Sequence, residues 1–419
     1  MAARGDGSGD PYVVIGGGQA GGRAVEGLRK AGYDGPVVLL SAEDMRPYER
    51  PPLSKQVLTG EADPESACLH PADWYWENDV ELRLTTRVQE IDRGRKRVGL
   101  QDGAEVAYDR LLLATGARPR VPDLRGLDLD GVHLLREVGD CLAIRGAMAP
   151  GARVVLVGGG YIGLEVAAAA IKRGCAATVL EAGDGLMRRQ VAPAVGNWYR
   201  ELHESKGVTV RTGAKVAALR GRDSVEAVEL ADGTQVEADL VVIGVGILPN
   251  SSLAAAAGLS VNDGILVDES AQTDDPAIWA AGDVTNHPNP YLGRRVRLES
   301  WQNAQNQALT AGRAMAGAPV RHAEVPWFWS DQHGVNLQIV GLPQRWERLV
   351  WRGDPAAGPG FSAFYLDGEG RVVAANAVDR PGDIAPARKM IEAGLAPEPQ
   401  ALADPDTSLK KVLKGQGPA

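Results

Sequence analysis

Cysteine is scarce in this chain. Only three cysteines occur among the 419 residues, at positions 68, 141 and 175, and no two of them form a CxxC or CxxxxC element. A sequence-local thiol redox motif is therefore excluded, and we expect three reduced thiols that pack. The six histidines are scattered and not set at metal-ligand spacing, so we expect no metal site.

Long apolar runs and an excess of basic residues are also missing. The longest apolar runs, such as residues 240–248, fall well short of the roughly 18 residues that span a bilayer. The first ten residues hold no apolar segment of the kind that a secretory signal needs. A net charge of −9 argues against nucleic acid as a partner. We expect a cytoplasmic protein that binds neither nucleic acid nor membrane.

The remaining composition is that of an ordinary globular protein. Apolar residues make up 44% and charged residues 24% of the chain. Its 419 residues are too many for one ordinary core, so two or three domains of about 100 to 200 residues each are expected.

A glycine-rich turn follows the first apolar strand. The segment from Tyr12 reads YVVIGGGQAGG and places Gly16, Gly18 and Gly21 between a strand and a helical stretch. These glycines suit the tight turn, the close approach of backbone to a pyrophosphate, and helix packing on the strand. A second strand, residues 37–40, precedes Glu43, the candidate acid for a ribose. The pattern predicts a dinucleotide site, although GxGxxG alone is a weak signal.

The same unit recurs later in the chain. RVVLVGGGYIGLE, residues 153–165, carries Gly158, Gly160 and Gly163 after a strand, and ATVLE ends in the acid Glu181. Two such units predict two dinucleotide folds. A further repeat supports this interpretation, because residues 100–119 and 230–249 share L-x-D-G-x-x-V-x-x-D, an apolar strand and G-x-x-P. Each copy is expected to form a hairpin at Asp-Gly and a return strand that closes the fold.

The last third of the chain has a different texture. PAIWAAGDV brings Gly282 and Asp283 to the end of a strand, where a carboxylate can accept hydrogen bonds from a cofactor polyol. This implies a return of the chain to the first domain. After Pro326, short alternating runs predict an antiparallel sheet, followed by a helix over residues 385–393 and a polar tail.

The segment RPYERPPLSK, residues 46–55, lies where many enzymes with such turns carry two reactive cysteines, yet it holds prolines and Lys55. Together with GGGQAG, LLLATGARPR, VVLVGGGYIGLE, AAGDV and PWFWSDQ, it makes the chain similar to the NADH-dependent ferredoxin reductases of bacterial oxygenase systems. These putidaredoxin reductase-like proteins are FAD-dependent pyridine nucleotide oxidoreductases. The resemblance extends from about Tyr12 to about Leu413.

The resemblance implies an α/β protein with two Rossmann-like, glutathione-reductase-like domains and a C-terminal α+β domain with an antiparallel sheet. We expect the FAD-binding domain to be discontinuous, over residues 1–117 and 250–325. The NAD-binding domain is expected over residues 118–249, and the C-terminal domain over residues 326–419.

The implied cofactors are FAD and NADH. The FAD candidates are Gly16, Gly18, Ala20, Gly21, Glu43, Arg50, Lys55, Val88, Ala114, Thr115, Gly116, Arg136, Gly282, Asp283 and Trp301. The NADH candidates are Gly158, Gly160, Tyr161, Ile162, Gly163, Glu165, Glu181, Arg188 and Gly246, with Trp329 beside the flavin. Relatives can carry an acid where this chain has Ala42, so Glu43 is expected to take over the ribose contact.

Lys55 and Glu165 are the candidate catalytic residues. In related reductases the lysine pairs with the matching glutamate, and its charge would stabilise the anionic reduced flavin. A surface lysine and a helix-face carboxylate are the structural alternatives. Glu181 favours NADH because it would repel a 2′-phosphate, whereas Arg188 and Arg189 could neutralise one.

We expect an enzyme that transfers a hydride from NADH to FAD. The FAD then passes single electrons to a 2Fe-2S ferredoxin that feeds a cytochrome monooxygenase or a ring-hydroxylating dioxygenase. Docking would be transient, on the Trp327 and Trp329 region and a basic patch; we expect a monomer or a weak dimer. The basic candidates are Arg294, Arg295, Arg297, Arg313, Lys410, Lys411 and Lys414. The alternatives are a rubredoxin or general NADH:acceptor reductase, and a redox-responsive interaction protein like apoptosis-inducing factor.

Overall fold

A computed structural model describes residues 9–318 and 320–415. The chain divides into two compact units, and each is described by itself. Unit 1 comprises the described residues up to Arg50, then residues 65–118 and 247–324. Unit 2 comprises residues 51–64, 119–246 and the described residues from Val325 onward. The chain leaves unit 1 along β8 (Ala117–Pro119) and returns along β17 (Ile247–Pro249), two strands that pair with each other.

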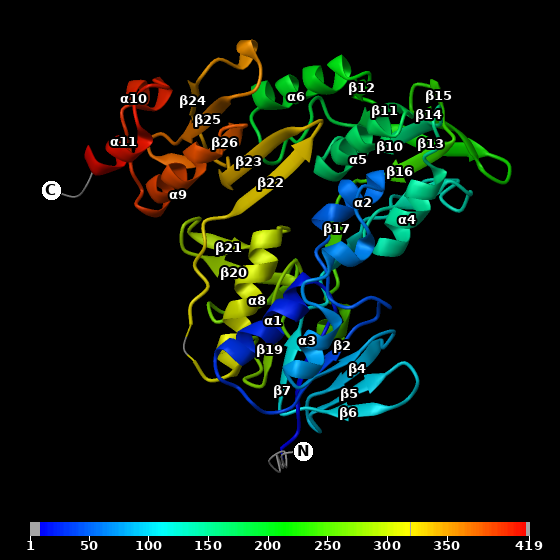
Figure 1. Cartoon of the computed structure of the whole chain (residues 1–419), viewed down its shortest axis with the longest axis vertical. Coiled ribbons are helices and arrows are strands. Elements are labelled where there is room, and N and C mark those ends of the chain that lie inside the picture. Colours follow the sequence, from blue (N-terminus) through cyan, green and yellow to red (C-terminus); the bar gives the residue numbers. More distant parts are fainter. Residues whose placement is uncertain (1–8, 319, 416–419) are drawn as a thin grey trace. The chain divides into compact units, whose positions relative to one another are not determined.

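Unit 1 is built on a five-stranded parallel sheet in the order β19-β7-β1-β2-β3. Figure 1 labels β2, β7 and β19 among these strands. Its strands are β1 (Tyr12–Ile15), β2 (Val37–Leu40), β3 (Val80–Arg83), β7 (Arg110–Leu113) and β19 (Ile278–Ala280). The sequences YVVI and VVLL are buried along their whole length, which is typical of strands that are covered on both faces.

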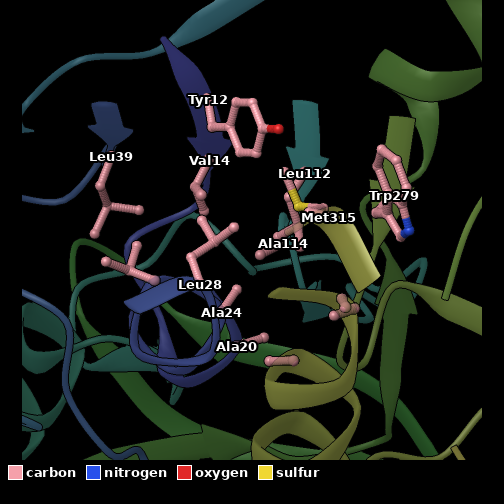
Figure 2. Packing of buried hydrophobic residues seen from close by; sticks show 14 of the residues in the cluster. Tyr12, Val14, Ala20, Ala24, Leu28, Leu39, Leu112, Ala114, Trp279 and Met315 are labelled. Atoms are coloured by element: carbon pink, nitrogen blue, oxygen red, sulfur yellow. The ribbon is translucent and has the colours of Figure 1, made fainter. Parts of the chain in front are cut away.

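Helices α1 (Gln19–Lys30) and α8 (Trp301–Met315) pack side by side against this sheet. Small residues allow the close approach, since a Cβ at Gly312 would lie 2.2 Å from the carbonyl oxygen of Ala24. Figure 2 shows the core that results, in which Leu28 lies beside Val14 and Trp279 completes the cluster.

Smaller elements complete unit 1. They are α3 (Ala72–Glu77), β4 (Val88–Asp92), β5 (Arg97–Leu100), β6 (Glu105–Ala107), α7 (Ser252–Ala256), β18 (Ile265–Leu266), β20 (Thr285–Asn289), β21 (Arg294–Val296) and the 3₁₀ turn η2 (Pro64–Ala67).

Unit 2 repeats the parallel sheet, in the order β12-β11-β10-β16-β9. Its strands are β9 (Val132–Leu134), β10 (Arg153–Val157), β11 (Ala176–Glu181), β12 (Thr209–Thr212) and β16 (Leu240–Ile243). Its helices are α4 (Val138–Ala147), α5 (Tyr161–Lys172) and α6 (Pro193–Ser205). The predicted second dinucleotide fold is thus confirmed.

The predicted pair of hairpins is also confirmed. β5 and β6 turn at Asp102 and Gly103, and β14 (Val225–Leu230) and β15 (Gln235–Glu237) turn at Asp232 and Gly233. Each hairpin joins a third strand, β4 in one case and β13 (Val216–Gly221) in the other. β7 and β16 then return to the parallel sheets, where they pair with the central strands β1 and β10.

A five-stranded antiparallel sheet, in the order β22-β23-β26-β25-β24, forms the C-terminal part of unit 2. Its strands are β22 (Trp327–Gln332), β23 (Val335–Gly341), β24 (Arg348–Arg352), β25 (Phe361–Leu366) and β26 (Val372–Val378). Two 3₁₀ turns, η3 (Pro355–Ala357) and η4 (Pro381–Asp383), and helix α9 (Ile384–Glu392) accompany them. The predicted sheet and its helix are confirmed.

The polar tail that the sequence shows after α9 contains two helices that were not predicted, α10 (Pro399–Ala403) and α11 (Leu409–Gly415). Leu402 and Leu409 are buried. The guanidinium of Arg352 donates to the carbonyl oxygens of Leu402, at 3.2 Å, and Thr407, at 2.9 Å. A buried arginine on a distant strand therefore orders a segment whose own composition is polar.

Residues 51–64 pack in unit 2, although the sequence placed them in the first domain. The segment forms η1 (Pro51–Ser54) and α2 (Gln56–Thr59). Arg145 and Arg173 donate to the carbonyl oxygens of Val57 and Thr59 at 3.2 and 3.1 Å. The division into three domains with the predicted boundaries stays a prediction.

Candidate functional site

The first glycine turn joins β1 to α1 in unit 1. A Cβ on Gly16 would lie 2.2 Å from the carbonyl oxygen of Ala114, and one on Gly21 would lie 1.8 Å from that of Gly16. Gly18 faces open space, since the nearest atom to its added Cβ is a nitrogen of Arg50 at 4.0 Å. The chain itself requires the first and third glycines, while the second leaves room for a bound group.

The second turn, between β10 and α5, repeats this arrangement. A Cβ on Gly158 would lie 2.4 Å from the carbonyl oxygen of Gly244, and one on Gly163 would lie 2.2 Å from that of Gly158. Nothing lies within 4 Å of a Cβ on Gly160. Gly18 and Gly160 are also the N-caps of α1 and α5, and neither helix start is capped by a side chain. Uncapped N–H groups beside open space fit a pyrophosphate.

The acids after the second strands are not equivalent. Leu40 pairs with Ile15, and Leu180 pairs with Val157, so Ser41 occupies in unit 1 the position that Glu181 occupies in unit 2. From the sequence alone, Ala42 is the position where relatives can carry the acid, and Ser41 is not singled out.

Glu181 is fixed by backbone groups of its own fold. Its carboxylate accepts N–H groups from Gly159 and Gly183 at 2.7 and 2.6 Å. Arg188 lies on the following loop and pairs with Asp184 at 2.7 Å. The carboxylate at the end of β11 is therefore held in place by backbone N–H groups, and its role toward a ribose stays a prediction.

Glu43 and Arg50 form a small cluster in unit 1. Arg50 donates to one carboxylate oxygen of Glu43 at 2.7 Å, and the hydroxyl of Tyr48 donates to the other at 2.5 Å. Arg50 also donates to the Tyr48 hydroxyl at 3.0 Å. The role of Glu43 toward a ribose stays a prediction.

The other unit 1 candidates lie at strand and helix ends. Thr115 follows β7 and exchanges two hydrogen bonds with Asn250, both of 2.9 Å. Gly282 follows β19 and donates its N–H to the side chain of Gln307 at 2.9 Å. The candidates that lie at or next to the end of a strand or helix are Val88, Ala114, Thr115, Gly116, Gly282, Asp283 and Trp301.

Lys55 and Glu165 are brought together in unit 2, as predicted. The ammonium of Lys55 lies 2.7 Å from Oε2 of Glu165, and the two side chains are 16% and 3% exposed. The hydroxyl of Ser54 donates to the same oxygen at 2.5 Å, and that of Ser330 donates to Oε1 at 2.6 Å. Three donors therefore surround this buried side chain, and its two carboxyl oxygens face Lys55, Ser54 and Ser330.

Ser54 and Ser330 were missed by sequence reasoning. Ser54 stands within PPLSK beside the predicted lysine, and Ser330 within PWFWSDQ on β22. For Ser330 the available signal was its period-two spacing from Phe328, which places it on the face of β22 opposite Trp327 and Trp329.

Trp327 and Trp329 lie on one face of β22, as their spacing predicted. Their rings stack with centroids 5.1 Å apart. On the other face, the ring of Phe328 lies 4.5 Å from that of Tyr161, at the start of α5. Of the remaining unit 2 candidates, Ile162 is exposed, Gly246 follows β16, and Arg136 donates its N–H to Asp140 near the start of α4.

The basic candidates are divided between the units. Arg294, Arg295, Arg297 and Arg313 belong to unit 1, and Lys410, Lys411 and Lys414 to unit 2. Arg297 pairs with Asp263 and Glu299 at 3.0 and 2.7 Å. Much of the charge of Arg297 is therefore balanced locally, and a single basic patch stays a proposal.

The described residues also bear on metal ligation, thiol chemistry and membrane insertion. No group of histidine, cysteine, aspartate or glutamate side chains there could hold a metal ion. The three cysteines are free, and Cys141 and Cys175 are buried. Within residues 9–318 and 320–415 no helix combines the length and the apolar character needed to cross a membrane.

These features define a protein with two dinucleotide-binding folds, and the comparisons with known proteins agree. The family model described as pyridine nucleotide-disulphide oxidoreductase matches residues 10–308, and the one described as reductase C-terminal matches residues 327–413. The chain belongs to the pyridine nucleotide-disulphide oxidoreductase family.

Its relatives resemble it over almost the whole chain. The ferredoxin–NAD(+) reductase component of the anthranilate 1,2-dioxygenase system of Burkholderia cepacia is 45% identical, with 97% of this chain and 100% of the relative covered. Putidaredoxin reductase of Pseudomonas putida is 40% identical over 96% and 97% of the two chains. The solved covalent complex of putidaredoxin reductase with putidaredoxin matches with a TM-score of 0.94, at 39% identity over 98% and 99%.

Proposed function

We propose that this chain is an NADH:ferredoxin reductase, which passes electrons from NADH through FAD to a 2Fe-2S ferredoxin that supplies a cytochrome monooxygenase or a ring-hydroxylating dioxygenase. The observation that carries the proposal is the Lys55–Glu165 pair, because Lys55 lies in the segment where disulfide reductases carry cysteines. Burial raises the pKa of the Cys141 thiol to about 11. With no reactive thiol pair, the flavin itself is left as the exit point for electrons.

Bound FAD would supply the chemistry that the side chains lack, because it accepts a hydride and releases electrons singly. The turn at Gly16, Gly18 and Gly21 would hold its pyrophosphate at the start of α1. The remaining proposed contacts come from Ala20, Glu43, Arg50, Lys55, Val88, Ala114, Thr115, Gly116, Arg136, Gly282, Asp283 and Trp301.

Preference for NADH follows from the end of β11. The Glu181 carboxylate is held by two backbone N–H groups and would accept ribose hydroxyls, whereas it would repel a 2′-phosphate. Arg188, which could have neutralised that phosphate, pairs with Asp184. The proposed nicotinamide-nucleotide contacts are Gly158, Gly160, Tyr161, Ile162, Gly163, Glu165, Glu181, Arg188 and Gly246.

Lys55 and Glu165 are proposed to act as a preorganised charge pair. Glu165 holds the Lys55 ammonium in one position, so no reorganisation is needed when negative charge develops near it. The hydroxyl groups of Ser54 and Ser330 donate hydrogen bonds to the carboxylate, and the lysine contributes its positive charge.

We place the acceptor at the Trp327 and Trp329 face of β22, with basic residues around it. Two stacked indole rings form a rigid, amphipathic surface of the kind enriched in interfaces. The ferredoxin would be acidic and would dock transiently. A cytoplasmic location and a monomeric or weakly dimeric state stay predictions from the sequence.

The test is to purify the protein under native conditions and assay it anaerobically. The proposal predicts a yellow protein that NADH bleaches, and faster reduction of a 2Fe-2S ferredoxin than of rubredoxin or of a disulfide. Faster reduction of rubredoxin would favour the general-acceptor alternative. Slow bleaching together with an NADH-induced dimer would favour a redox-responsive interaction protein.

A further inference from the structure

One face of β22 carries polar side chains into the interior of unit 2. Phe328, Ser330 and Gln332 alternate along this face. Phe328 packs on Tyr161, while Ser330 and Gln332 are completely buried. Buried polar groups cost free energy unless they are hydrogen-bonded, so the partners of these two side chains need an account.

The partners form one continuous chain of hydrogen bonds. Ser330 Oγ lies 2.6 Å from Glu165 Oε1, and Gln332 Nε2 lies 3.0 Å from Ser330 Oγ. His203 Nε2, on α6, lies 2.8 Å from Gln332 Oε1. His333 Nε2 then lies 3.1 Å from His203 Nδ1. The chain leads from the buried carboxylate to the half-buried His333 without a gap.

Chemistry fixes the direction of each link. The Glu165 carboxylate only accepts, so the Ser330 hydroxyl must donate to it and accept from the Gln332 amide NH₂. The amide oxygen of Gln332 then faces His203 and accepts from Nε2–H. A neutral His203 has one ring proton, so its Nδ1 accepts from His333 Nε2–H. All donors in the chain therefore point toward Glu165.

Both histidines are neutral at ordinary pH, as this argument requires. Burial lowers the pKa of His203. Burial, and secondarily the neighbouring His203 and Lys206, lower the pKa of His333 to about 4. The chain transmits polarisation and not protons, because the amide of Gln332 is neither an acid nor a base in this pH range.

We propose that Ser330, Gln332 and His203 are positioning residues that orient the charged Glu165 carboxylate, and that the tautomer of His203 is set by the charge of Glu165. The catalytic importance of these hydrogen bonds rests on the proposed function, whereas the direction in which they donate does not. Linked hydrogen bonds in a buried site strengthen one another, so a break at His203 weakens the support of Glu165.

A single substitution is expected to reverse the chain. In Glu165→Gln, the introduced carbonyl oxygen must face Lys55 and Ser54, because Lys55 can only donate. The introduced NH₂ therefore faces Ser330, whose hydroxyl accepts from it and donates its own hydrogen bond to the amide oxygen of Gln332. The Gln332 amide turns over and donates to His203 Nε2, which leaves the ring proton of His203 on Nδ1.

The first experiment reads the histidine ring nitrogens directly. We label the full-length flavin-loaded protein with ¹⁵N-histidine, record ring correlations at pH 7.5, and assign His203 by the signal lost in His203→Leu. We expect the Nε2–H tautomer in the wild type and the Nδ1–H tautomer in Glu165→Gln. The control is His322→Leu, which leaves the Lys55–Glu165 pair intact and should keep the Nε2–H tautomer of His203.

An unchanged His203 tautomer in Glu165→Gln would overturn the proposal, and so would a switch in His322→Leu. A charged His203 in the wild type at pH 7.5 would also contradict it. These outcomes do not depend on whether NADH reduces the flavin.

The second experiment measures the limiting rate constant for flavin reduction by NADH. His203→Leu should lower it about three- to tenfold, the effect of one net hydrogen bond. In the Glu165→Gln background the same substitution should change the rate by less than about twofold, because no charge is left to support. The matched control is His322→Leu, because His322 is a buried histidine of unit 1 that takes no part in these hydrogen bonds.

An equal loss in both backgrounds would show that His203 acts only on the fold, and would overturn the positioning role. If the wild type is not reduced by NADH at all, the proposed function fails, while the tautomer experiment still decides the direction of the chain.

Discussion

We predict how the stability of unit 1 depends on pH from two of its buried histidines, His287 and His322. Their rings meet edge to face with centroids 5.1 Å apart, and they are 1% and 4% exposed. His322 is hydrogen-bonded to the side-chain oxygen of Asn303 at 3.1 Å. Neither ring nitrogen of His287 has a hydrogen-bond partner among the described residues.

Burial is the main cause that lowers the pKa of His287 from 6.5 to about 3, with smaller effects of His322 and Arg295. Burial also lowers the pKa of His322 to about 4. Because the folded state binds the proton less well, the stability is fully present above pH 6.5 and is lost as the pH falls toward 3 to 4. At about 1.4 kcal/mol per pH unit, each histidine costs about 2 kcal/mol by pH 5.

The perturbation is His287→Leu, and the assay is urea-induced unfolding at pH 7.5 and pH 5.0, followed by circular dichroism. Between these two values the variant should lose about 2 kcal/mol less of its free energy of unfolding than the wild type. At pH 7.5 it should be at least as stable, because the substitution removes two buried polar atoms that have no partner.

His322→Leu is the matched comparison. It should flatten the pH dependence by a similar amount, yet it should be less stable at pH 7.5 because Asn303 loses its partner. If His287→Leu shows the same loss of stability between pH 7.5 and 5.0 as the wild type, the reasoning from burial is refuted.

The remaining predictions concern the two turns and the proposed reaction. Gly163→Ala should destabilise the apoprotein by more than about 3 kcal/mol in thermal unfolding, because the new methyl group meets backbone at 2.2 Å. Gly160→Ala, whose added Cβ has nothing within 4 Å, should change stability by less than about 1 kcal/mol. It should nevertheless weaken NADH binding, as measured by calorimetry. Lys55→Met should slow flavin reduction by NADH in stopped-flow absorbance, and an unchanged rate would remove Lys55 from the mechanism. Trp329→Ala should slow ferredoxin reduction while leaving ferricyanide reduction within about twofold of the wild type, and equal losses with both acceptors would argue against a docking role.

Local chemistry made much of the fold predictable. The turn at Gly16 and its repeat at Gly158 are imposed by backbone atoms closer than any Cβ could tolerate, and such constraints leave glycine in the sequence. The Asp-Gly hairpins were predictable for the same reason, because Gly103 and Gly233 have φ of 86° and 84°. The stacking of Trp327 on Trp329 followed from the period of a strand.

Long-range contacts were not predictable in this way. Glu165, Ser330 and His203 belong to three separate elements, and no local pattern reports which buried polar groups will meet. The placement of residues 51–64 in unit 2 depends on Arg145 and Arg173, which lie about a hundred residues further along the chain. Lys55 and Glu165 were found only because the motifs around them resemble a known family.

The most direct test of the central claim is an anaerobic stopped-flow experiment with the flavin-loaded protein, NADH and a 2Fe-2S ferredoxin. The account predicts rapid bleaching of the flavin, then reduction of the ferredoxin one electron at a time, and no turnover with a disulfide substrate. A flavin that NADH leaves oxidised, or a reduced protein that transfers its electrons to a disulfide and not to the ferredoxin, would contradict it.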